Sequence, residues 1–112
     1  PKKDRLRARK RWIAYNAKTA GKITVDDGAR EALLKRNTSL LACGVRSVEG
    51  IFAYGDTVMI VGSDGREFAR GLCNYSSEDA DRIKGMSTKD AEKIIEKGFY
   101  QEVVHRDNLV IL

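Results

Sequence analysis

Histidine and cysteine are scarce in this chain of 112 residues, and their scarcity excludes several kinds of site. His105 is the only histidine, so a His-rich metal centre is excluded. Cys43 and Cys73 are the only cysteines, thirty positions apart and each beside apolar residues. This spacing matches neither a metal-ligand motif nor a disulfide framework. We therefore expect two small buried hydrophobic side chains in a reducing compartment.

Long apolar runs are also absent, because no stretch approaches the roughly 18 residues that cross a bilayer. The N-terminus is basic and lacks the apolar segment of a signal peptide. We expect no membrane partner and a cytoplasmic location. The chain starts at Pro1 without a Met, which suggests a fragment or a processed product. Its length matches one domain, and 42% hydrophobic residues suit a folded globular one.

The net charge of +5 is concentrated at one end of the chain. Residues 1–11 hold seven of the 21 basic side chains and one of the 16 acidic ones, a balance of +6. The other 101 residues carry 14 basic and 15 acidic side chains, a balance of −1. Such a tail can contact phosphates without specificity, but a solvated linker is the favoured interpretation.

Catalytic and phosphate-binding motifs are missing or have simpler explanations. Gly62–Gly65 lacks the following helix and Lys-Ser/Thr of a phosphate loop, so its glycines indicate a hairpin turn. His105 and Asp107 invite a catalytic reading, but no nucleophile is indicated nearby, and a structural role or surface contact is favoured. Asp26 and Asp27 could bind a cation, although a helix start explains them better. The aromatic residues do not alternate with basic ones as in a nucleic-acid stacking platform, and we expect most in the core or at its rim.

Capping residues followed by apolar residues at helical spacing predict three helices. Asp26 or Asp27 can accept the free amide hydrogens of a first turn, and Asn37 can end that helix in the left-handed conformation. Ser76 and Ser87 each precede an Asp by three residues, the offset of a capping box. The helices are expected near 27–36, 77–84 and 88–97.

Short strands are predicted for most of the remaining chain. Thr57–Val61 is apolar enough to be buried on both faces, and Ser63–Gly65 indicates the hairpin turn that follows it. Gly71 in the return strand marks a bulge or a close backbone approach. The other strands are expected at Trp12–Tyr15, Lys22–Val25, within Leu40–Phe52 and at Leu109–Leu112. The fold class is therefore mainly β with short α-helices, closed into a small pseudo-barrel because closure removes exposed edges.

Short motifs, several of them containing glycine, follow one another in a specific order. They are Gly21-x-Ile23-x-Val25-Asp26-x-Gly28-Ala29, Ser39-Leu40-Leu41, Gly44-Val45-x-x-Val48-x-Gly50-x-Phe52, Gly55-Asp56-x-Val58, Asp64-Gly65-Arg66, Ala69-x-Gly71 and Tyr75-Ser76. In combination they resemble the PUA domain, which is named after pseudouridine synthases and archaeosine transglycosylases. The resemblance implies a β pseudo-barrel of a kind that often binds structured RNA.

Three further stretches narrow the family. They are Arg9-Lys10-Arg11-Trp12-Ile13-Ala14, Asn74-Tyr75-Ser76-Ser77 and His105-Arg106-Asp107-Asn108-Leu109-Val110. These stretches look like the C-terminal region of bacterial glutamate 5-kinases, although Tyr15 stands where many relatives carry glycine. The resemblance implies a PUA domain at residues 22–112. It also implies that residues 1–21 are a basic linker and the end of a missing amino-acid-kinase domain.

The glutamate 5-kinase family transfers the γ-phosphate of ATP to the side-chain carboxylate of glutamate, the first step of proline synthesis. Its active site lies in the amino-acid-kinase domain, so no catalytic residue can be carried onto this chain. The resemblance implies no cofactor and no metal for these residues, and ATP with Mg²⁺ for the kinase domain. It implies the kinase domain of the same chain as a partner, and a homo-oligomer in the full enzyme.

Two functions follow as alternatives. The first is a non-catalytic accessory domain of glutamate 5-kinase, acting in assembly or regulation. The second is the RNA-binding PUA module of an RNA-modifying enzyme. A domain with a balance of −1 outside its tail is poorly equipped to bind phosphates, so the accessory role is favoured and RNA binding is expected to be weak. The residues expected on any RNA-binding face are Gly28, Ala29, Arg30, Arg46 and Arg70.

Overall fold

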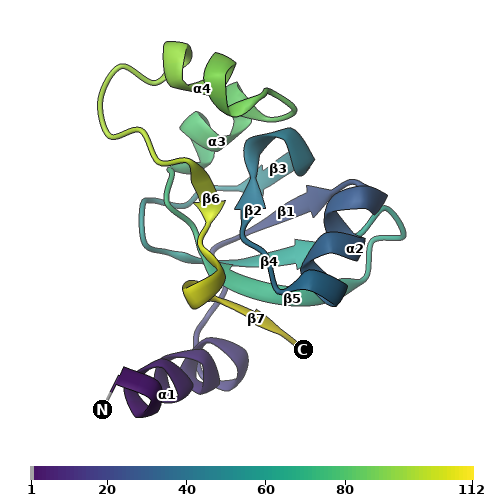
Figure 1. The fold of residues 1–112 in the computed structure, drawn as a ribbon, viewed down its shortest axis with the longest axis vertical. Coiled ribbons are helices and arrows are strands. Elements are labelled where there is room, and N and C mark those ends of the chain that lie inside the picture. Colours follow the sequence, from purple (N-terminus) through teal and green to yellow (C-terminus); the bar gives the residue numbers. More distant parts are fainter. Residues whose placement is uncertain (1) are drawn as a thin grey trace.

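The computed structural model of the protein describes residues 2–112. The strands are β1 (Gly21–Val25), β2 (Leu40–Leu41), β3 (Val45–Gly50), β4 (Thr57–Val61), β5 (Glu67–Leu72), β6 (Glu102–Val104) and β7 (Leu109–Ile111). The helices are α1 (Lys2–Tyr15), α2 (Asp27–Arg36), α3 (Ser77–Ile83) and α4 (Thr88–Ile94), with 3₁₀ turns at Ala42–Gly44 and Arg106–Asn108. The strands form a sheet of order β3-β1-β4-β5-β7 and a second, two-stranded sheet of β2 and β6 (Figure 1).

The larger sheet is mixed. β1 lies between β3 and β4, antiparallel to the first and parallel to the second. β4 and β5 form the predicted hairpin, and Gly65 in its turn has a φ of 80°, which glycine adopts without the strain of a Cβ. Four of the five residues of β4 are buried, as its run of β-branched side chains predicts.

The two sheets meet at Gly71 on β5. A Cβ at this position would collide with Cγ1 of Val104 on β6 and would lie 2.9 Å from the carbonyl oxygen of Asn108. The close backbone approach expected at Gly71 is therefore confirmed. In Figure 1, β2 and β6 lie in front of the larger sheet, and buried side chains of both sheets belong to one core cluster. This arrangement is the β pseudo-barrel expected from the sequence.

The three predicted helices are present with their predicted caps. Asp26 accepts from the backbone N–H of Ala29, and Ser76 and Ser87 accept in the same way at α3 and α4. Asn37 ends α2 with a φ of 51°. The last helix stops at Ile94 and not at residue 97, because Ile95 turns to an extended conformation and is buried in the core.

Trp12–Tyr15 is helical, so the strand expected there is wrong. These residues form the last turn of α1, which begins inside the charged segment. Leu6, Lys10, Ile13 and Ala14 recur at helical spacing and are the less exposed residues of α1, with Ile13 fully buried. The inner face of α1 packs against β7 and β5. Most side chains of residues 3–11 are exposed, so the segment is solvated as expected, but it is helical and continuous with the docked end of α1.

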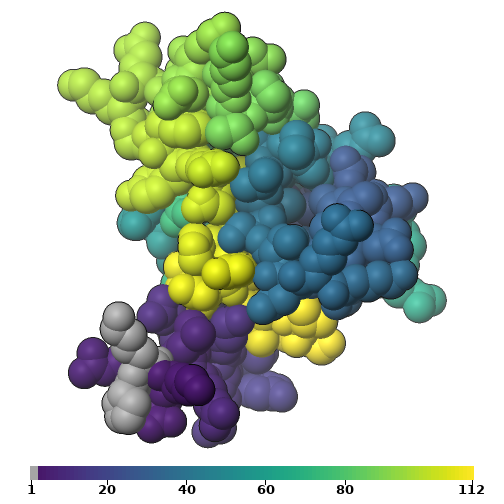
Figure 2. Space-filling model, in the orientation of Figure 1, coloured from purple at the N-terminus to yellow at the C-terminus, as the bar shows by residue number. Residues whose placement is uncertain are grey.

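The helices occupy opposite ends of the molecule. In Figure 2, α1 forms one end, while α3 and α4 form the other, beyond the sheets. β6 was not expected from the sequence, because its three residues are too few to show a strand pattern. No helix within residues 2–112 has the length and apolar composition to cross a bilayer.

Candidate functional site

The first turn of α2 combines an exposed backbone with a tightly packed inner side. Asp26 Oδ1 lies 2.7 Å from the N–H of Ala29, and the Asp26 N–H donates to the carbonyl of Gly44 at 3.0 Å. A Cβ on Gly44 would lie 2.6 Å from the Cβ of Ala29, so Ala29 faces inward. Gly28 is exposed. The expected helix start at Asp26 is confirmed; of the two residues, Gly28 is exposed and Ala29 is half-buried.

Arg30 joins α2 to the hairpin between β4 and β5. Its guanidinium carbon lies 5.4 Å from the centre of the Phe68 ring, a cation–π arrangement. A Cβ on Gly62 would lie 2.8 Å from Cδ of Arg30, so the side chain crosses the hairpin directly over this glycine. Nearby, Ser63 Oγ donates to Asp27 Oδ1 at 2.7 Å. Asp27 thus holds the hairpin turn.

Arg46 is exposed on β3, at a bulge. Ser47 pairs with Thr24 and Val45 with Val25, so Arg46 is the extra residue between two aligned pairs. Its side chain is the most freely presented of the three arginines expected on an RNA-binding face.

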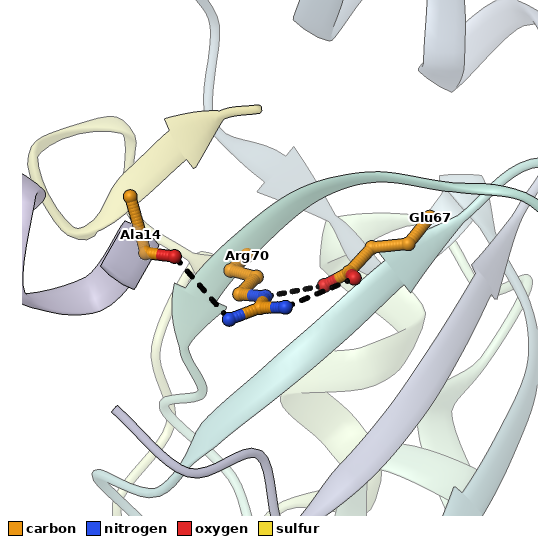
Figure 3. A network of polar contacts seen from close by, with 3 residues as sticks. All are labelled: Ala14, Glu67 and Arg70. Carbon is orange, nitrogen blue, oxygen red and sulfur yellow. Dashed lines mark hydrogen bonds and ion pairs between the residues drawn. The ribbon is translucent and has the colours of Figure 1, made fainter. Parts of the chain in front are cut away.

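Arg70 is half-buried and is held by Glu67 on its own strand, β5, and by Ala14 of α1 (Figure 3). Its Nε and Nη2 donate to the Glu67 carboxylate at 2.6 and 3.2 Å, and its Nη1 donates to the carbonyl oxygen of Ala14 at 3.3 Å. The hydrogen bond to Glu67 raises the pKa of Arg70 above its ordinary value, against the opposing effect of burial. Arg70 therefore fastens α1 to β5, a role that sequence could not distinguish from phosphate binding.

A groove runs between α2 and β2 and leads to a polar hollow. The apolar part has a volume of about 260 Å³, and Cys43 lines it. Thr38, Ser39 and Leu41 also line the polar hollow beside His105 and Arg106. Both the Cys43 side chain and the groove are open to solvent, so the expected burial of Cys43 is wrong. The 3₁₀ turn Ala42–Gly44 buries the residues on either side of Cys43 and leaves its side chain outside.

His105 and Cys73 have structural positions. Nδ1 of His105 accepts from the N–H of Asp107 at 3.0 Å and caps the 3₁₀ turn Arg106–Asn108. Ser39 Oγ accepts from the N–H of Arg106 at 2.7 Å. The structural role expected for His105 is confirmed. Cys73 is fully buried, and this burial raises the pKa of its thiol to about 11.

A second hollow, near α3, was not anticipated from the sequence. It has a volume of about 380 Å³ and is lined by three tyrosines and by Asn74, Ser76, Asp79 and Gly98. Tyr54, Tyr75 and Tyr100 come from three separate segments, so no local sequence motif predicts that they lie close together. The expectation that most aromatic residues lie in the core or at its rim holds for Tyr75, which is buried. Tyr54 and Tyr100 are exposed.

Comparison with known proteins agrees with this fold. The PUA domain model matches residues 21–109. The chain is 51% identical over all 112 residues to the glutamate 5-kinase of Caldanaerobacter subterraneus and 46% identical to that of Dictyoglomus thermophilum. It spans about 30% of the length of each, in the C-terminal region.

Two solved structures have the same fold. A PUA domain from Aeropyrum pernix is 26% identical, with a TM-score of 0.54 over 78% of this chain and 41% of that one. A PUA domain protein from Thermoplasma acidophilum is 24% identical, with a TM-score of 0.52 over 67% of this chain and 49% of that one. On the strength of the match to residues 21–109 and the pseudo-barrel that these residues form, the chain belongs to the PUA domain family.

Proposed function

We propose that this chain is the non-catalytic C-terminal PUA domain of a glutamate 5-kinase, with an accessory role in assembly or regulation. One observation carries the proposal. The identity to glutamate 5-kinases extends over the whole chain, whereas the PUA model begins at residue 21. Residues 1–20, which include α1, are thus shared with these enzymes and lie outside the general PUA pattern.

The parent activity is the transfer of the ATP γ-phosphate to the glutamate side chain, in the cytoplasm. Within residues 2–112 there is no cluster of three His, Cys, Asp or Glu side chains of the kind that can hold a metal ion. The glycine pair at Gly62 and Gly65 forms a hairpin turn with no helix after it. We assign ATP and Mg²⁺ to an amino-acid-kinase domain outside this chain.

The attachment of α1 supports an accessory role. Ile13 is buried, Arg70 binds the Ala14 carbonyl, and Arg9 donates to Asn108 Oδ1 at 2.5 Å. A helix fixed at these points gives the domain a defined orientation to any segment that continues from it. We therefore take the kinase domain as the partner of this domain, in an enzyme that is a homo-oligomer. Weak RNA binding through the basic side chains of α1 remains part of this proposal.

A graft tests the proposal. The matching region of the Caldanaerobacter subterraneus glutamate 5-kinase is replaced by residues 1–112 of this chain, and glutamate-dependent ATP turnover and oligomeric state are measured. We expect the graft to keep both. A matched graft carrying Gly71→Leu, which forces β5 and β6 apart, should lose both the ATP turnover and the oligomeric state. A folded graft that neither assembles nor turns over ATP contradicts the accessory role. Glutamate-dependent turnover by residues 1–112 alone contradicts the non-catalytic assignment.

A further inference from the structure

The hollow lined by Tyr54, Tyr75 and Tyr100 is built from three parts of the chain. Tyr54 belongs to the turn between β3 and β4, Tyr75 immediately precedes the cap of α3, and Tyr100 lies between α4 and β6. With its volume of about 380 Å³, the hollow falls within the range of small-molecule sites, roughly 300–1,000 Å³. It is therefore large enough for one side chain or one small molecule.

Two hydrogen bonds join Tyr75 to Tyr100, and ring contacts add Tyr54 to the group. The Tyr75 hydroxyl donates to the carbonyl of Tyr100 at 2.5 Å and accepts from the N–H of Tyr100 at 2.6 Å. The ring of Tyr100 meets that of Tyr75 edge-on at 6.1 Å and stacks with that of Tyr54 at 5.6 Å. Tyr75 is 3% exposed, while Tyr54 is 61% and Tyr100 41% exposed. Two aromatic rings are thus presented to solvent on a support that is already ordered.

The charge of the hollow is negative. Among the described residues that line it, Asp79 alone carries a charge. Burial raises the pKa of Tyr75, and the negative charges of Asp79 and Glu102 raise it further, against the hydrogen bond to Tyr100, which lowers it. Phosphate and carboxylate ligands are therefore disfavoured here, and cations are favoured.

Arg82 is the one described side chain that forms an ion pair with Asp79. Its Nη1 lies 3.3 Å from Asp79 Oδ1, through a single contact, and the two side chains are 53% and 41% exposed. Arg82 lines the adjoining hollow on the other side of Asp79 and does not line the tyrosine hollow. Exposed single-contact pairs are weak, so Asp79 remains able to attract a second cation.

We propose that this hollow, the tyrosine site, binds an alkylguanidinium or alkylammonium cation against the Tyr54 and Tyr100 rings, paired with Asp79. Aromatic faces attract cations through the negative potential of their π electrons, and this attraction grows when water is excluded. A planar guanidinium can stack on a tyrosine and pair with a carboxylate at the same time, so guanidinium is the preferred form. The cation is either a small metabolite or the side chain of a protein segment, for which the Arg-rich α1 of a second copy is the source available on this chain.

Titration of the whole chain with ethylguanidinium tests the site, with NMR observation of the tyrosine rings. Ethylurea has the same shape without the charge and is the matched ligand control. We expect ethylguanidinium to shift the Tyr54 and Tyr100 resonances saturably, and ethylurea to leave them unchanged at equal concentration. Equal shifts by both ligands, or no saturable shift by either, would overturn the proposal.

Variants locate the binding. Tyr54→Leu and Asp79→Asn should each weaken ethylguanidinium binding about three- to tenfold. The backbone N–H of Asp79 donates to Ser76 Oγ, the cap of α3. Because this bond does not use the Asp79 side chain, the Asn variant keeps it. Tyr15→Leu, at an exposed tyrosine of α1, is the protein control and should change nothing. Unchanged binding in the Tyr54→Leu variant, which alters an exposed turn and should not disturb folding, sinks the proposal.

A peptide of residues 2–12 distinguishes the sources. Saturable shifts of the same rings by this peptide, lost when its arginines are replaced by citrulline, identify a polypeptide side chain as the cation. Shifts by ethylguanidinium without shifts by the peptide exclude α1 as the source and favour a small molecule. Both results support the site, and shifts by the peptide that persist in both the Tyr54→Leu and Asp79→Asn variants count against it.

Discussion

The two ends of the molecule are attached to the sheets in different ways. At one end, α3 and α4 contribute Ala80, Ile83, Ala91 and the adjoining Ile95 to the central core. At the other end, α1 is held by one fully buried side chain, Ile13, and by hydrogen bonds from Arg9 and Arg70. Apolar burial integrates the first end into the cooperative fold, whereas the second depends on a few contacts. We therefore expect the two ends to differ in stability and in the ligands they bind.

The largest expected effect is the difference in global stability between the Ile83→Ala and Ile13→Ala variants. Ile83 is a core residue, so its truncation should lower the free energy of unfolding by about 2–5 kcal/mol. Ile13→Ala should instead release α1 locally, because a free helix of this length is marginal in water. Urea denaturation measures the first effect, and amide hydrogen exchange within residues 6–14 measures the second. Equal losses of global stability in both variants would show that the two ends are equivalent.

The next largest expected effect is a loss of RNA affinity when the basic N-terminal segment is removed. Residues 1–11 carry a balance of +6, so their deletion should weaken binding to a structured RNA hairpin by about tenfold or more at low salt. Binding by the full chain should also fall steeply toward physiological salt. Arg30→Ala and Arg46→Ala are the controls and should change little. If the shortened domain still binds one RNA tightly at physiological salt, and Arg46→Ala costs more than about 1 kcal/mol, the barrel itself reads RNA.

A smaller effect is expected at the link between β5 and α1. In the double variant Arg70→Met with Glu67→Gln, no buried charge is left unpaired, and the hydrogen bond to the Ala14 carbonyl is lost. Exchange of the α1 amides should accelerate about three- to tenfold, the consequence of one hydrogen bond. Arg46→Met removes an exposed arginine of the same sheet and should leave the exchange unchanged. Unaltered exchange in the double variant would mean that Ile13 and Arg9 hold α1 without help from Arg70.

The smallest effect on the fold is expected from thiol alkylation. Cys43 is exposed and should react with iodoacetamide at pH 8. Cys73 is buried with a pKa of about 11, which leaves about one thiolate in a thousand at pH 8, so it should react only on unfolding. Because this pKa lies above the usual 9.0, Cys73 also favours the folded state below about pH 9 and loses that contribution as the pH rises toward 11. Mass spectrometry after graded urea treatment separates the two thiols, and early labelling of Cys73 would contradict its burial.

Local signals in the sequence predicted much of the fold. The helix starts at Asp26, Ser76 and Ser87 could be predicted because a capping side chain accepts a hydrogen bond from a backbone N–H only three residues later. The hairpin at Gly65 is equally local. The helical spacing of Leu6 and Ile13 was missed because the charged residues between them obscure it, although the pattern was present. β6 could not be predicted, since its pairing with β2 depends on residues more than sixty positions away.

The candidate sites were less predictable, for a physical reason. Sequence supplies the arginines but not their partners, so Arg70 looks as available as Arg46 until Glu67 and Ala14 are placed beside it. The tyrosine site requires the contact of residues 54, 75 and 100, which only the finished fold creates. Cys43 was misjudged because burial in a 3₁₀ turn alternates over single residues.

The position of β6 and β7 has a consequence for how the protein is made. β6 supplies half of the smaller sheet, and β7 forms one edge of the larger one. Neither sheet is complete until residues 102–111 have left the ribosome. Until then, β2 lacks its partner β6 and β5 lacks its partner β7, so backbone groups along one edge of each strand are unpaired. Pairings between residues this far apart form slowly. During synthesis the unpaired edges of β2 and β5 are thus open to a chaperone or to a neighbouring nascent chain.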